Sequence, residues 1–368
     1  MIKIFIQKIY KKIAYSFFFK IYGEIKNSIK ANSDKRIKVD IIKLDNYLEY
    51  KTYKITNGRL YTDRIHDTAI ILENKIIEEP SFQLRHNNNS PVSNNIVFKK
   101  GTPRILRNLK GSALSLLTGG GGNSNYWHWL YDVLPRLEIC EKTKKLNEID
   151  YFILPSLEKK FQKETLNKLN INNKKMLSSK KFRHIKVNEL LVTDHPYIFT
   201  NDSHKDAQNI PLWIIKWLRK SFLKNLEPLN KNYPKKIFID RTDPKSDSAK
   251  VRSIVNEKEI KIFLEEKNFS FVKLHELSFT DQINYFNNAD CIMGLHGGGF
   301  ANLSFCKKDT KVIEFRTDKS GPIIENLAKK NNLKYDSIII NLGNSDHDKQ
   351  SGHLNIPLIT IKEKINES

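Results

Sequence analysis

The sequence predicts an α/β protein of two lobes, the second of which is Rossmann-like. From residue 236 onward, short apolar runs alternate with amphipathic helical stretches, a pattern typical of a parallel sheet with helices on both faces. The chain has 368 residues, which is more than the ~250–300 at which a single core stops growing. Its hydrophobic content of 39% supports a substantial core and excludes wholesale disorder.

Residues 1–30 form the first predicted element. Apolar side chains recur there near helical spacing, with lysines between them, which indicates a basic amphipathic helix. Such a helix lies either on an anionic membrane surface or on the protein's own surface, and the sequence leaves both open. The longest uncharged apolar stretch in this region, residues 13–19, is far short of the ~20 residues that span a bilayer, so we expect no transmembrane helix.

Strand-like runs dominate the next part of the chain. Asn57–Gly58 is predicted to form a hairpin turn between two of them. After the glycines 119–122, Asn123 or Ser124 is expected to cap a helix over 125–134. The expected strands are 37–43, 51–56, 68–72, 75–78, 112–118 and 151–154.

Three features precede the predicted lobe boundary. Pro135 is expected to kink or end the helix over 125–134, because proline lacks the amide hydrogen and clashes with the preceding turn. A region rich in lysine and asparagine is predicted as helix and loop to about residue 185. An amphipathic helix follows over 211–225, and the boundary itself is placed at Pro228–Pro234.

The second lobe shows regular alternation. Asn256 followed by Glu259 is a capping-box arrangement that predicts a helix start, and Ser278 with Asp281 predicts another. Gly297–Phe305 is predicted as a glycine-opened turn and helix. The expected strands are 236–239, 269–274, 290–295, 312–315 and 335–340, and the last helix is 322–331.

The net charge of the chain limits the classes of partner that we expect it to bind. The 63 Lys and Arg residues against 41 Asp and Glu give a net charge of +22, and 51 of the basic residues are lysines. Specific nucleic-acid binding is not expected, because it depends on the bidentate contacts of arginine. An anionic membrane, a nucleotide-bearing substrate and simple solubility fit the charge equally well. Three cysteines without CxxC spacing predict free thiols in a cytoplasmic protein, which is peripheral on the inner face of the plasma membrane if it binds lipid.

A glycine-rich turn is the first candidate site. The segment Leu295–Asn302 (LHGGGFAN) follows a predicted strand and opens a helix, and its three glycines let backbone amides approach an oxyanion closely. His296, at the carboxyl end of the strand, lies where open α/β sheets bind ligands. The pattern predicts a phosphate site, and the alternative is a turn that packs a helix tightly against a strand. It is not the dinucleotide GxGxxG pattern.

The second candidate is a histidine–carboxylate pair. His128 and Asp132 are four residues apart and share a helix face, where such a pair can take a proton from an incoming hydroxyl. The alternative is a pair that only orients the helix. The sequence does not decide which of the two is the base.

Two arginines form the third candidate. Arg241 follows a predicted strand and Arg252 precedes Asn256–Glu257, so forked donors are expected to bind an anion there unless both arginines face solvent. No metalloprotease, nucleophile-elbow or Walker pattern occurs, and no metal site is expected.

Taken together, these blocks resemble glycosyltransferase family 61, which includes proteins of bacterial capsular-polysaccharide loci. The similar segments are NYWHWLYDVLPRL (125–137), IDR (239–241) with Arg252, and GLHGGGFANLSFC (294–306) followed by the Val-Ile-Glu strand at 312–314. Their order and spacing agree with the family, and the resemblance extends from about residue 45 to 340. Gly298 stands where the family usually has alanine.

The resemblance implies a GT-B-like fold of two Rossmann-type lobes with a cleft between them. It implies inverting transfer from a nucleotide-activated sugar, a UDP-sugar by default, to a hydroxyl of a cell-surface or capsular glycan precursor, which can be lipid-linked. No cofactor or essential metal is expected. The implied organisation is a basic segment 1–35, an acceptor lobe 36–228, a donor lobe 229–345 and a tail 346–368. The alternative is a non-catalytic nucleotide- or anion-binding protein of the same fold.

The resemblance also implies roles for single residues. His128 and Asp132 would line the acceptor side as catalytic residues, and Glu314 would bind the ribose hydroxyls of the donor. The remaining donor-binding residues would be Arg241, Arg252, Asn256, Glu257, His296, Gly297, Gly298, Gly299 and Asn302.

Overall fold

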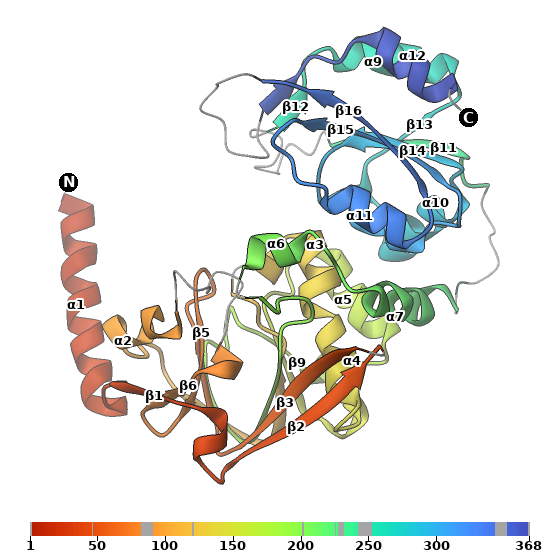
Figure 1. Ribbon diagram of the computed structural model, residues 1–368. Helices are drawn as coiled ribbons and strands as arrows, with labels where there is room; N and C mark the ends of the chain where they lie inside the picture. Colours follow the sequence, from red (N-terminus) through yellow and green to blue (C-terminus); the bar gives the residue numbers. More distant parts are fainter. Residues whose placement is uncertain are drawn as a thin grey trace. The chain divides into compact units, whose positions relative to one another are not determined.

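The computed structural model describes residues 2–45, 47–81, 91–119, 121–200, 202–224, 226, 232–241, 252–342 and 352–366, and for residues 2–10 and 204 it describes the backbone alone. The chain divides into two compact units, unit 1 (Met1–Asp206) and unit 2 (Ala207–Ser368) (Figure 1). Both units combine sheets with helices, which confirms the predicted α/β class. The helix α7 (Leu212–Leu223) belongs to unit 2, although the sequence placed it before the lobe boundary; Pro228 lies outside the described residues.

Unit 1 is built around a mixed sheet that has ten strands within the described residues. Its order is β1-β6-β5-β4-β10-β7-β8-β9, with β3 also paired to β10 and β2 paired to β3. The part β10-β7-β8-β9 is parallel throughout. The strands are β1 (Asn27–Ile29), β2 (Ile37–Leu44), β3 (Leu48–Thr56), β4 (Arg59–Thr62), β5 (Thr68–Leu72), β6 (Lys75–Ile77), β7 (Arg107–Ser115), β8 (Tyr151–Leu154), β9 (Met176–Ser178) and β10 (His184–Thr193).

The helices of this part of the chain are short, apart from the first. They are α1 (Ile2–Tyr22), α2 (Val97–Lys100), α3 (Tyr126–His128), α4 (Pro135–Glu141), α5 (Lys160–Lys168) and α6 (Ser203–Ala207), which spans the boundary between the units. Apolar side chains cover the sheet on two sides. One cluster contains Tyr53, Leu60 and Leu190, and the other contains Tyr61, Ala69 and Ile71 from alternate positions of β4 and β5.

The central strand β10 was not predicted. The region expected as helix and loop to about residue 185 ends where β10 begins, and it also contains the strand β9, which was not expected. The strand β10 begins with alternating buried and exposed residues and ends with four consecutive buried ones. It is buried because it lies between β7 on one side and β3 and β4 on the other. Lysine and asparagine in the surrounding sequence concealed this pattern.

The predicted hairpin at Asn57–Gly58 is also wrong. β3 pairs with β10 through residues 52–56, and β4 pairs with the same strand through residues 59–61. The two strands therefore lie end to end along β10 instead of side by side. Asn57 takes a φ of 54° and breaks the strand without reversing it.

The helix that carries His128 continues past Pro135. Asn125 is the cap, in place of Asn123 or Ser124, and its side chain accepts a hydrogen bond from the Trp127 amide at 2.9 Å. Residues 129–133 form a π turn, in which the Leu134 amide donates to the Trp129 carbonyl at 3.1 Å. Pro135 then begins α4, where its missing amide hydrogen costs nothing. Leu130, Val133, Leu134 and Leu137 of this helix are buried.

Unit 2 contains the predicted parallel sheet. Its order is β13-β11-β14-β15-β16, with every pair parallel. The chain moves from β11 to β13 on one side and then returns to β14 on the other side of β11, which makes a topological switch point between β11 and β14. The strands are β11 (Lys236–Ile239), β13 (Ser270–Val272), β14 (Cys291–Leu295), β15 (Lys311–Thr317) and β16 (Lys334–Ile340).

Helices cover both faces of this sheet (Figure 1). Ile260 and Ile361, from two helices on one face, pack in one cluster with Met293 and Phe315 of the sheet. On the other face, the rings of Phe222, Phe279 and Phe305 pack edge to face. The helices are α7, α9 (Glu257–Glu266), α10 (Phe279–Asn288), α11 (Ile323–Lys330) and α12 (Leu358–Asn366), and a small parallel pair joins β12 (Arg252–Ile254) to β17 (Gly352–Leu354).

Two local predictions in unit 2 need correction. The helix α9 begins directly after Asn256, as predicted, but the Asn256 side chain does not form the predicted cap. It binds the backbone of Ile356 instead, accepting from the amide at 3.0 Å and donating to the carbonyl at 2.8 Å. The segment after the glycine turn, Gly298–Phe305, is a 3₁₀ helix. Ser278 caps α10 as predicted, by accepting from the Asp281 amide at 3.0 Å.

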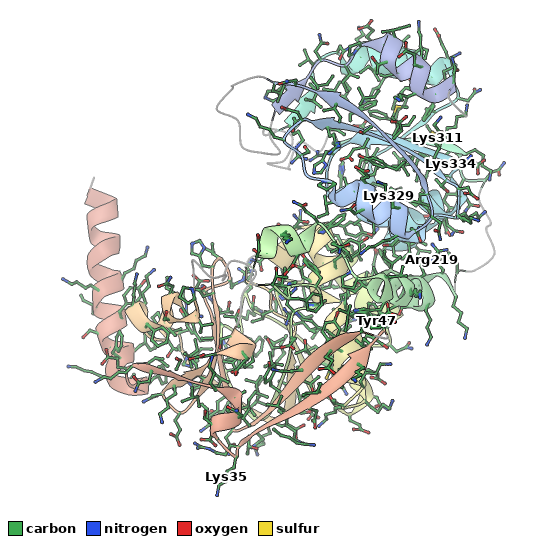
Figure 2. All side chains as sticks on the ribbon, in the orientation of Figure 1. Lys35, Tyr47, Arg219, Lys311, Lys329 and Lys334 are labelled. Atoms are coloured by element: carbon green, nitrogen blue, oxygen red, sulfur yellow. The ribbon has the colours of Figure 1, made fainter. Side chains whose placement is uncertain are left out.

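Lysines cover both units. Lys35 of unit 1 and Lys329 and Lys334 of unit 2 are exposed, and Lys35 projects outward (Figure 2). Among the described residues, no helix has the length and apolarity that crossing a bilayer requires. Cys140, Cys291 and Cys306 are free thiols, as predicted.

Candidate functional site

The first cluster of candidate residues lies at the switch point of the unit 2 sheet. Asp240 and Arg241 follow the carboxyl end of β11, and His296 and Gly297 follow the carboxyl end of the neighbouring strand β14. Open α/β sheets bind ligands at such a point, because the loops after the two strands diverge there. The strand pairing alone therefore brings Arg241 next to the glycine turn.

Two guanidinium groups meet on one carbonyl in this cluster. Nη1 of Arg241 and Nη1 of Arg252 each donate to the carbonyl oxygen of His296 at 2.6 Å. Gly297 makes room for them, since a Cβ at this position would lie 2.9 Å from Nη1 of Arg241. The structure thus brings two of the candidate sites, the arginine pair and the glycine turn, together.

Among the described residues, acidic side chains compensate the positive charge of this cluster only in part. Burial, and then the charge of Arg252, lower the pKa of Arg241 to about 10, and burial lowers the pKa of Arg252 as well. Nε of Arg252 is buried without a hydrogen-bond partner in the described residues. The nearby acids Asp240 and Glu257 form their ion pairs with Lys261, at 2.9 and 3.0 Å. An anion placed between the two guanidinium groups would relieve their repulsion.

The imidazole of His296 is oriented by the buried carboxylate of Glu314. Its Nδ1 bonds Oε1 of Glu314, and the hydroxyl of Tyr335 donates to Oε2 of the same carboxylate at 2.5 Å. Burial, and then Glu314, raise the pKa of Tyr335 well above its usual value, so the phenol keeps its proton. Both oxygens of Glu314 are therefore engaged inside the protein, an arrangement that orients the imidazole and does not favour ribose binding.

Most of the other predicted donor residues contact other parts of the protein, and one is partly exposed. Asn302 is fully buried and donates to Oε1 of Gln282 at 3.1 Å, so it stabilises the turn from inside. A Cβ at Gly299 would lie 2.8 Å from Cδ1 of Leu274, which indicates the tight packing that the sequence left as an alternative. Asn256 is engaged with the backbone of Ile356, as described above. Gly298 is partly exposed in the turn beside His296.

A small pocket of about 60 Å³ adjoins the arginine pair. Arg241, Arg252, Ser253 and Glu257 supply its polar lining. The pocket is too small for a nucleotide sugar, whose sites usually measure ~300–1,000 Å³. Within unit 2, a ligand group in this pocket would lie next to Arg241 and Arg252.

The second cluster lies in unit 1, at the carboxyl ends of the parallel strands β7 and β10. The chain leaves β7 toward β8 on one side and returns to β10 on the other, so this is also a switch point. His128 and Asp132 lie on the helix after β7. His195 and Tyr197 follow the end of β10.

Asp132 is the centre of this cluster and is fully buried. Its Oδ2 bonds Nδ1 of His128 at 2.8 Å, and its Oδ1 accepts from the hydroxyl of Tyr197 at 2.6 Å. Nε2 of His195 lies 3.6 Å from Oδ2. Arg136 ties the helix to β10, because its Nε donates to the Asp132 carbonyl at 3.0 Å and its Nη1 to the Thr193 carbonyl at 3.1 Å.

The pKa values of these groups are shifted in different directions, and this separates their roles. Burial favours a neutral Asp132, but the charge and hydrogen bond of His128, followed by the nearby ring of His195, hold the pKa of Asp132 well below its usual range. Burial also disfavours a charged His128, yet Asp132 outweighs it and raises the pKa of His128 above 6.5. The pKa of His195 is lowered by burial, so that ring is neutral, and burial raises the pKa of Tyr197.

This geometry can carry out proton transfer. The side chain of His128 is 25% exposed, whereas that of Asp132 is out of reach of solvent. With the Nδ1 proton directed to Asp132, Nε2 of His128 is left as the acceptor for a proton from a hydroxyl. Within the described ranges, no three His, Cys, Asp or Glu side chains are arranged to hold a metal ion.

Sequence reasoning missed four residues of the two clusters. His195 and Tyr197 follow β10, so recognising that strand would have placed them at its carboxyl end. Arg136 lies inside the quoted 125–137 block, but its role depends on a contact with β10. Tyr335 carries no local signal, because only the pairing of β15 with β16 brings it to Glu314.

Comparison with known proteins gives one family. A family model described as Glycosyltransferase 61 matches residues 126–313, which is just over half of the chain. The match includes His128 and Asp132 of one cluster and Arg241, Arg252 and His296 of the other. A search of curated proteins gives no match. Most residues of the two clusters thus lie within the matched part of the chain. The match shows that the protein belongs to the glycosyltransferase 61 family and is a glycosyltransferase.

Proposed function

We propose that this glycosyltransferase takes a nucleotide-activated sugar, with a UDP-sugar as the default, and transfers the sugar with inversion to a hydroxyl of a cell-surface or capsular glycan precursor. The observation that carries the proposal is the pair of guanidinium groups on the His296 carbonyl. Two adjacent cations at a switch point fit a diphosphate, which carries negative charge on both phosphates.

Unit 2 is the donor side in this proposal. Arg241 and Arg252 bind the diphosphate and stabilise the charge that develops on it as the glycosidic bond breaks. His296 directs its Nε2 to a phosphate oxygen, and Gly297 keeps the backbone close to the ligand. Glu314 acts as a positioning residue for His296, in place of the predicted ribose contact. Because fixed cations supply the charge, we propose that transfer needs no metal.

Unit 1 is the acceptor side. Nε2 of His128 takes the proton from the acceptor hydroxyl as that oxygen attacks the anomeric carbon, and the bond to the diphosphate breaks in the same step. Asp132 is a positioning residue that holds Nδ1 of His128 and stabilises the imidazolium that forms. The GT-B-like arrangement of the two lobes and the cytoplasmic location stay predictions.

Nucleotide binding and turnover test the proposal separately. Thermal-shift screening against nucleoside diphosphates, followed by calorimetry, should show binding, because a ligand of the native state raises its melting temperature. Release of nucleoside diphosphate from a panel of nucleotide sugars should then identify the donor. Binding without any turnover would favour the non-catalytic alternative. If Arg252→Gln keeps both nucleotide binding and turnover at the wild-type level, the proposed donor site is refuted.

A further inference from the structure

One helix of unit 1 has an apolar face that no described residue covers. Ile13, Phe17 and Ile21 of α1 are 64%, 58% and 53% exposed. They are spaced four residues apart, so they form a single stripe along the helix. Apolar groups gathered in this way on a surface mark an interaction site.

The opposite side of α1 fixes the direction of this stripe. The Leu106 amide donates to the Tyr22 hydroxyl at 2.9 Å, and the Tyr22 ring meets the edge of the His184 ring at 4.9 Å. The ring of Phe19 lies against Gly101 at the end of α2, where a Cβ would be 3.3 Å away. The carboxyl end of α1 is therefore attached to unit 1 (Figure 1), while the side chains of the stripe stay exposed.

The charge around the stripe has one sign. The helix Ile2–Tyr22 contains no acidic residue, and Lys11, Lys12 and Lys20 are exposed. Lys99 and Lys100 are exposed at the end of α2, next to the residue that Phe19 contacts. The nearest acid in sequence, Glu24, pairs with Lys26 at 3.3 Å. A surface of this kind is complementary to anionic lipid.

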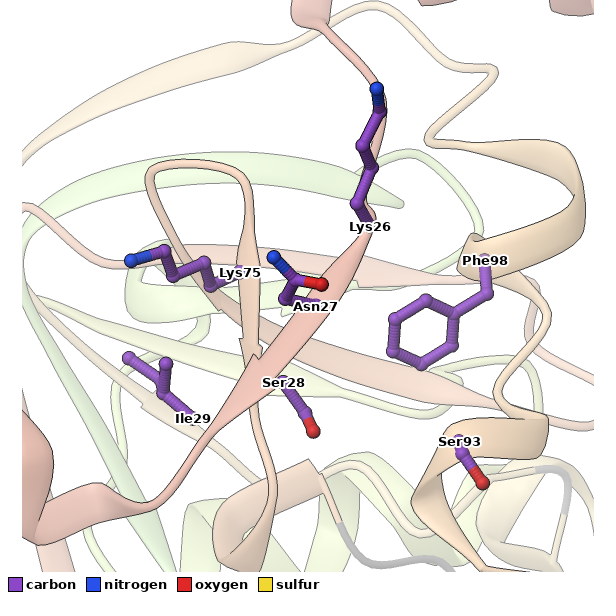
Figure 3. A pocket seen from close by; sticks show the side chains of 7 residues that line it. All are labelled: Lys26, Asn27, Ser28, Ile29, Lys75, Ser93 and Phe98. Atoms are coloured by element: carbon purple, nitrogen blue, oxygen red, sulfur yellow. The ribbon is translucent and has the colours of Figure 1, made fainter.

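A wide pocket of about 680 Å³ lies where the chain leaves α1 (Figure 3). Lys26 and Lys75 line it, together with Phe98 of α2. The hydroxyl of Ser28, also in the lining, donates to Glu78 at 2.6 Å, so an acid stands beside the pocket. Lys26 thus lies next to Glu24 and the pocket itself next to Glu78, so the pocket does not form a site for one particular headgroup.

We propose that α1 attaches the protein to the surface of an anionic bilayer. Ile13, Phe17 and Ile21 enter the boundary between headgroups and acyl chains, while the lysines remain among the lipid phosphates. The helix lies in the plane of the membrane and does not cross it. Recognition is of surface charge, not of one lipid species. The inference does not depend on the proposed sugar transfer.

Vesicle flotation with the full chain tests this attachment. We expect binding to phosphatidylcholine vesicles that contain about one third phosphatidylglycerol, weak binding to phosphatidylcholine alone, and release as salt is raised. Each lysine near the surface contributes about fivefold, so Lys11→Gln, Lys12→Gln and Lys20→Gln together should weaken binding on the order of 100-fold. Equal amounts of phosphatidylserine and phosphatidylglycerol should give equal binding.

The apolar stripe is tested with matched variants. Ile13→Ser, Phe17→Ser and Ile21→Ser together should reduce vesicle binding at least tenfold, whereas Ile41→Ser and Ile65→Ser, at other exposed apolar positions of unit 1, should leave it unchanged. Circular dichroism checks that the variants fold. Absence of binding, equal binding to neutral vesicles, or loss in the control variants would overturn the proposal. So would concentration-dependent self-association through the stripe, measured by analytical ultracentrifugation.

Discussion

Replacing Asp132 with asparagine tests the proposed acceptor side most directly. The carboxylate accepts from Nδ1 of His128 at 2.8 Å and from the Tyr197 hydroxyl at 2.6 Å. An amide of the same shape removes the charge and presents a donor to one of these two partners. If the amide nitrogen faces His128, Nδ1 must accept, the ring proton moves to Nε2, and His128 can no longer act as a base.

The size of the effect follows from this geometry. If the amide turns the other way, His128 keeps its tautomer but loses the charge that raises its pKa and stabilises the imidazolium. General bases contribute about 10²- to 10⁴-fold, and wrong-tautomer variants of comparable sites lose about 10⁴-fold, so kcat should fall by about 10²- to 10⁴-fold. The partners of Asp132 described above, His128, Tyr197 and His195, all belong to unit 1, so nucleotide affinity should stay within about twofold, or ~0.4 kcal/mol.

The assay measures release of nucleoside diphosphate and, by calorimetry, nucleotide binding in the same preparations. Asp67→Asn is the matched control, because Asp67 is also buried in unit 1 and accepts from the Ile96 amide at 2.8 Å. Both variants should lose about 1–3 kcal/mol of unfolding free energy, but the control should keep its kcat. Wild-type kcat in Asp132→Asn, or an equal loss of nucleotide affinity, would refute the reasoning.

Three other outcomes are expected. Arg252→Gln should weaken nucleoside diphosphate binding about 10- to 100-fold in calorimetry, since charge-assisted bonds are worth about 1.5–3 kcal/mol, whereas exposed Arg107→Gln should not; equal effects would rule out a specific site. Gly299→Ala should lower unfolding free energy by about 1–3 kcal/mol in denaturant titration, because its Cβ would lie 2.8 Å from Leu274, and unchanged stability would contradict the packing role. The pKa of His128 is raised above 6.5, so kcat/KM should fall as pH decreases through that raised value, and a flat profile there would exclude His128 as the base. The same raised pKa gives a contribution to stability that is complete below pH 6.5 and disappears as pH rises through the folded value.

The sequence predicted the parts of the fold that local pattern determines. The strand–helix alternation of unit 2 was readable because each strand is short, apolar and flanked by a helix signal, and β11 was placed at its observed bounds. β10 was not readable, because its burial comes from neighbours on both sides and not from its own composition. Because β10 was not predicted, the positions of His195 and Tyr197 after its carboxyl end were not predicted either.

The candidate residues show the same division. His128 and Asp132 could be paired from spacing alone, since a helix brings positions four apart together. The convergence of Arg241 and Arg252 followed from motifs at strand ends. The inward direction of Asn302 and Glu314 could not be predicted, because it depends on partners, Gln282 and Tyr335, that are distant in sequence.

The position of Arg241 and Arg252, which both donate to the His296 carbonyl, has a consequence for turnover. Under the proposed function, the group that these cations hold is common to the incoming donor and to the spent nucleotide, so departure of the product has to break the same contacts that captured the substrate. The released nucleotide therefore competes with the incoming donor for this site. The pace of glycan assembly would then depend on how quickly other enzymes remove the released nucleotide, as well as on the supply of activated sugar.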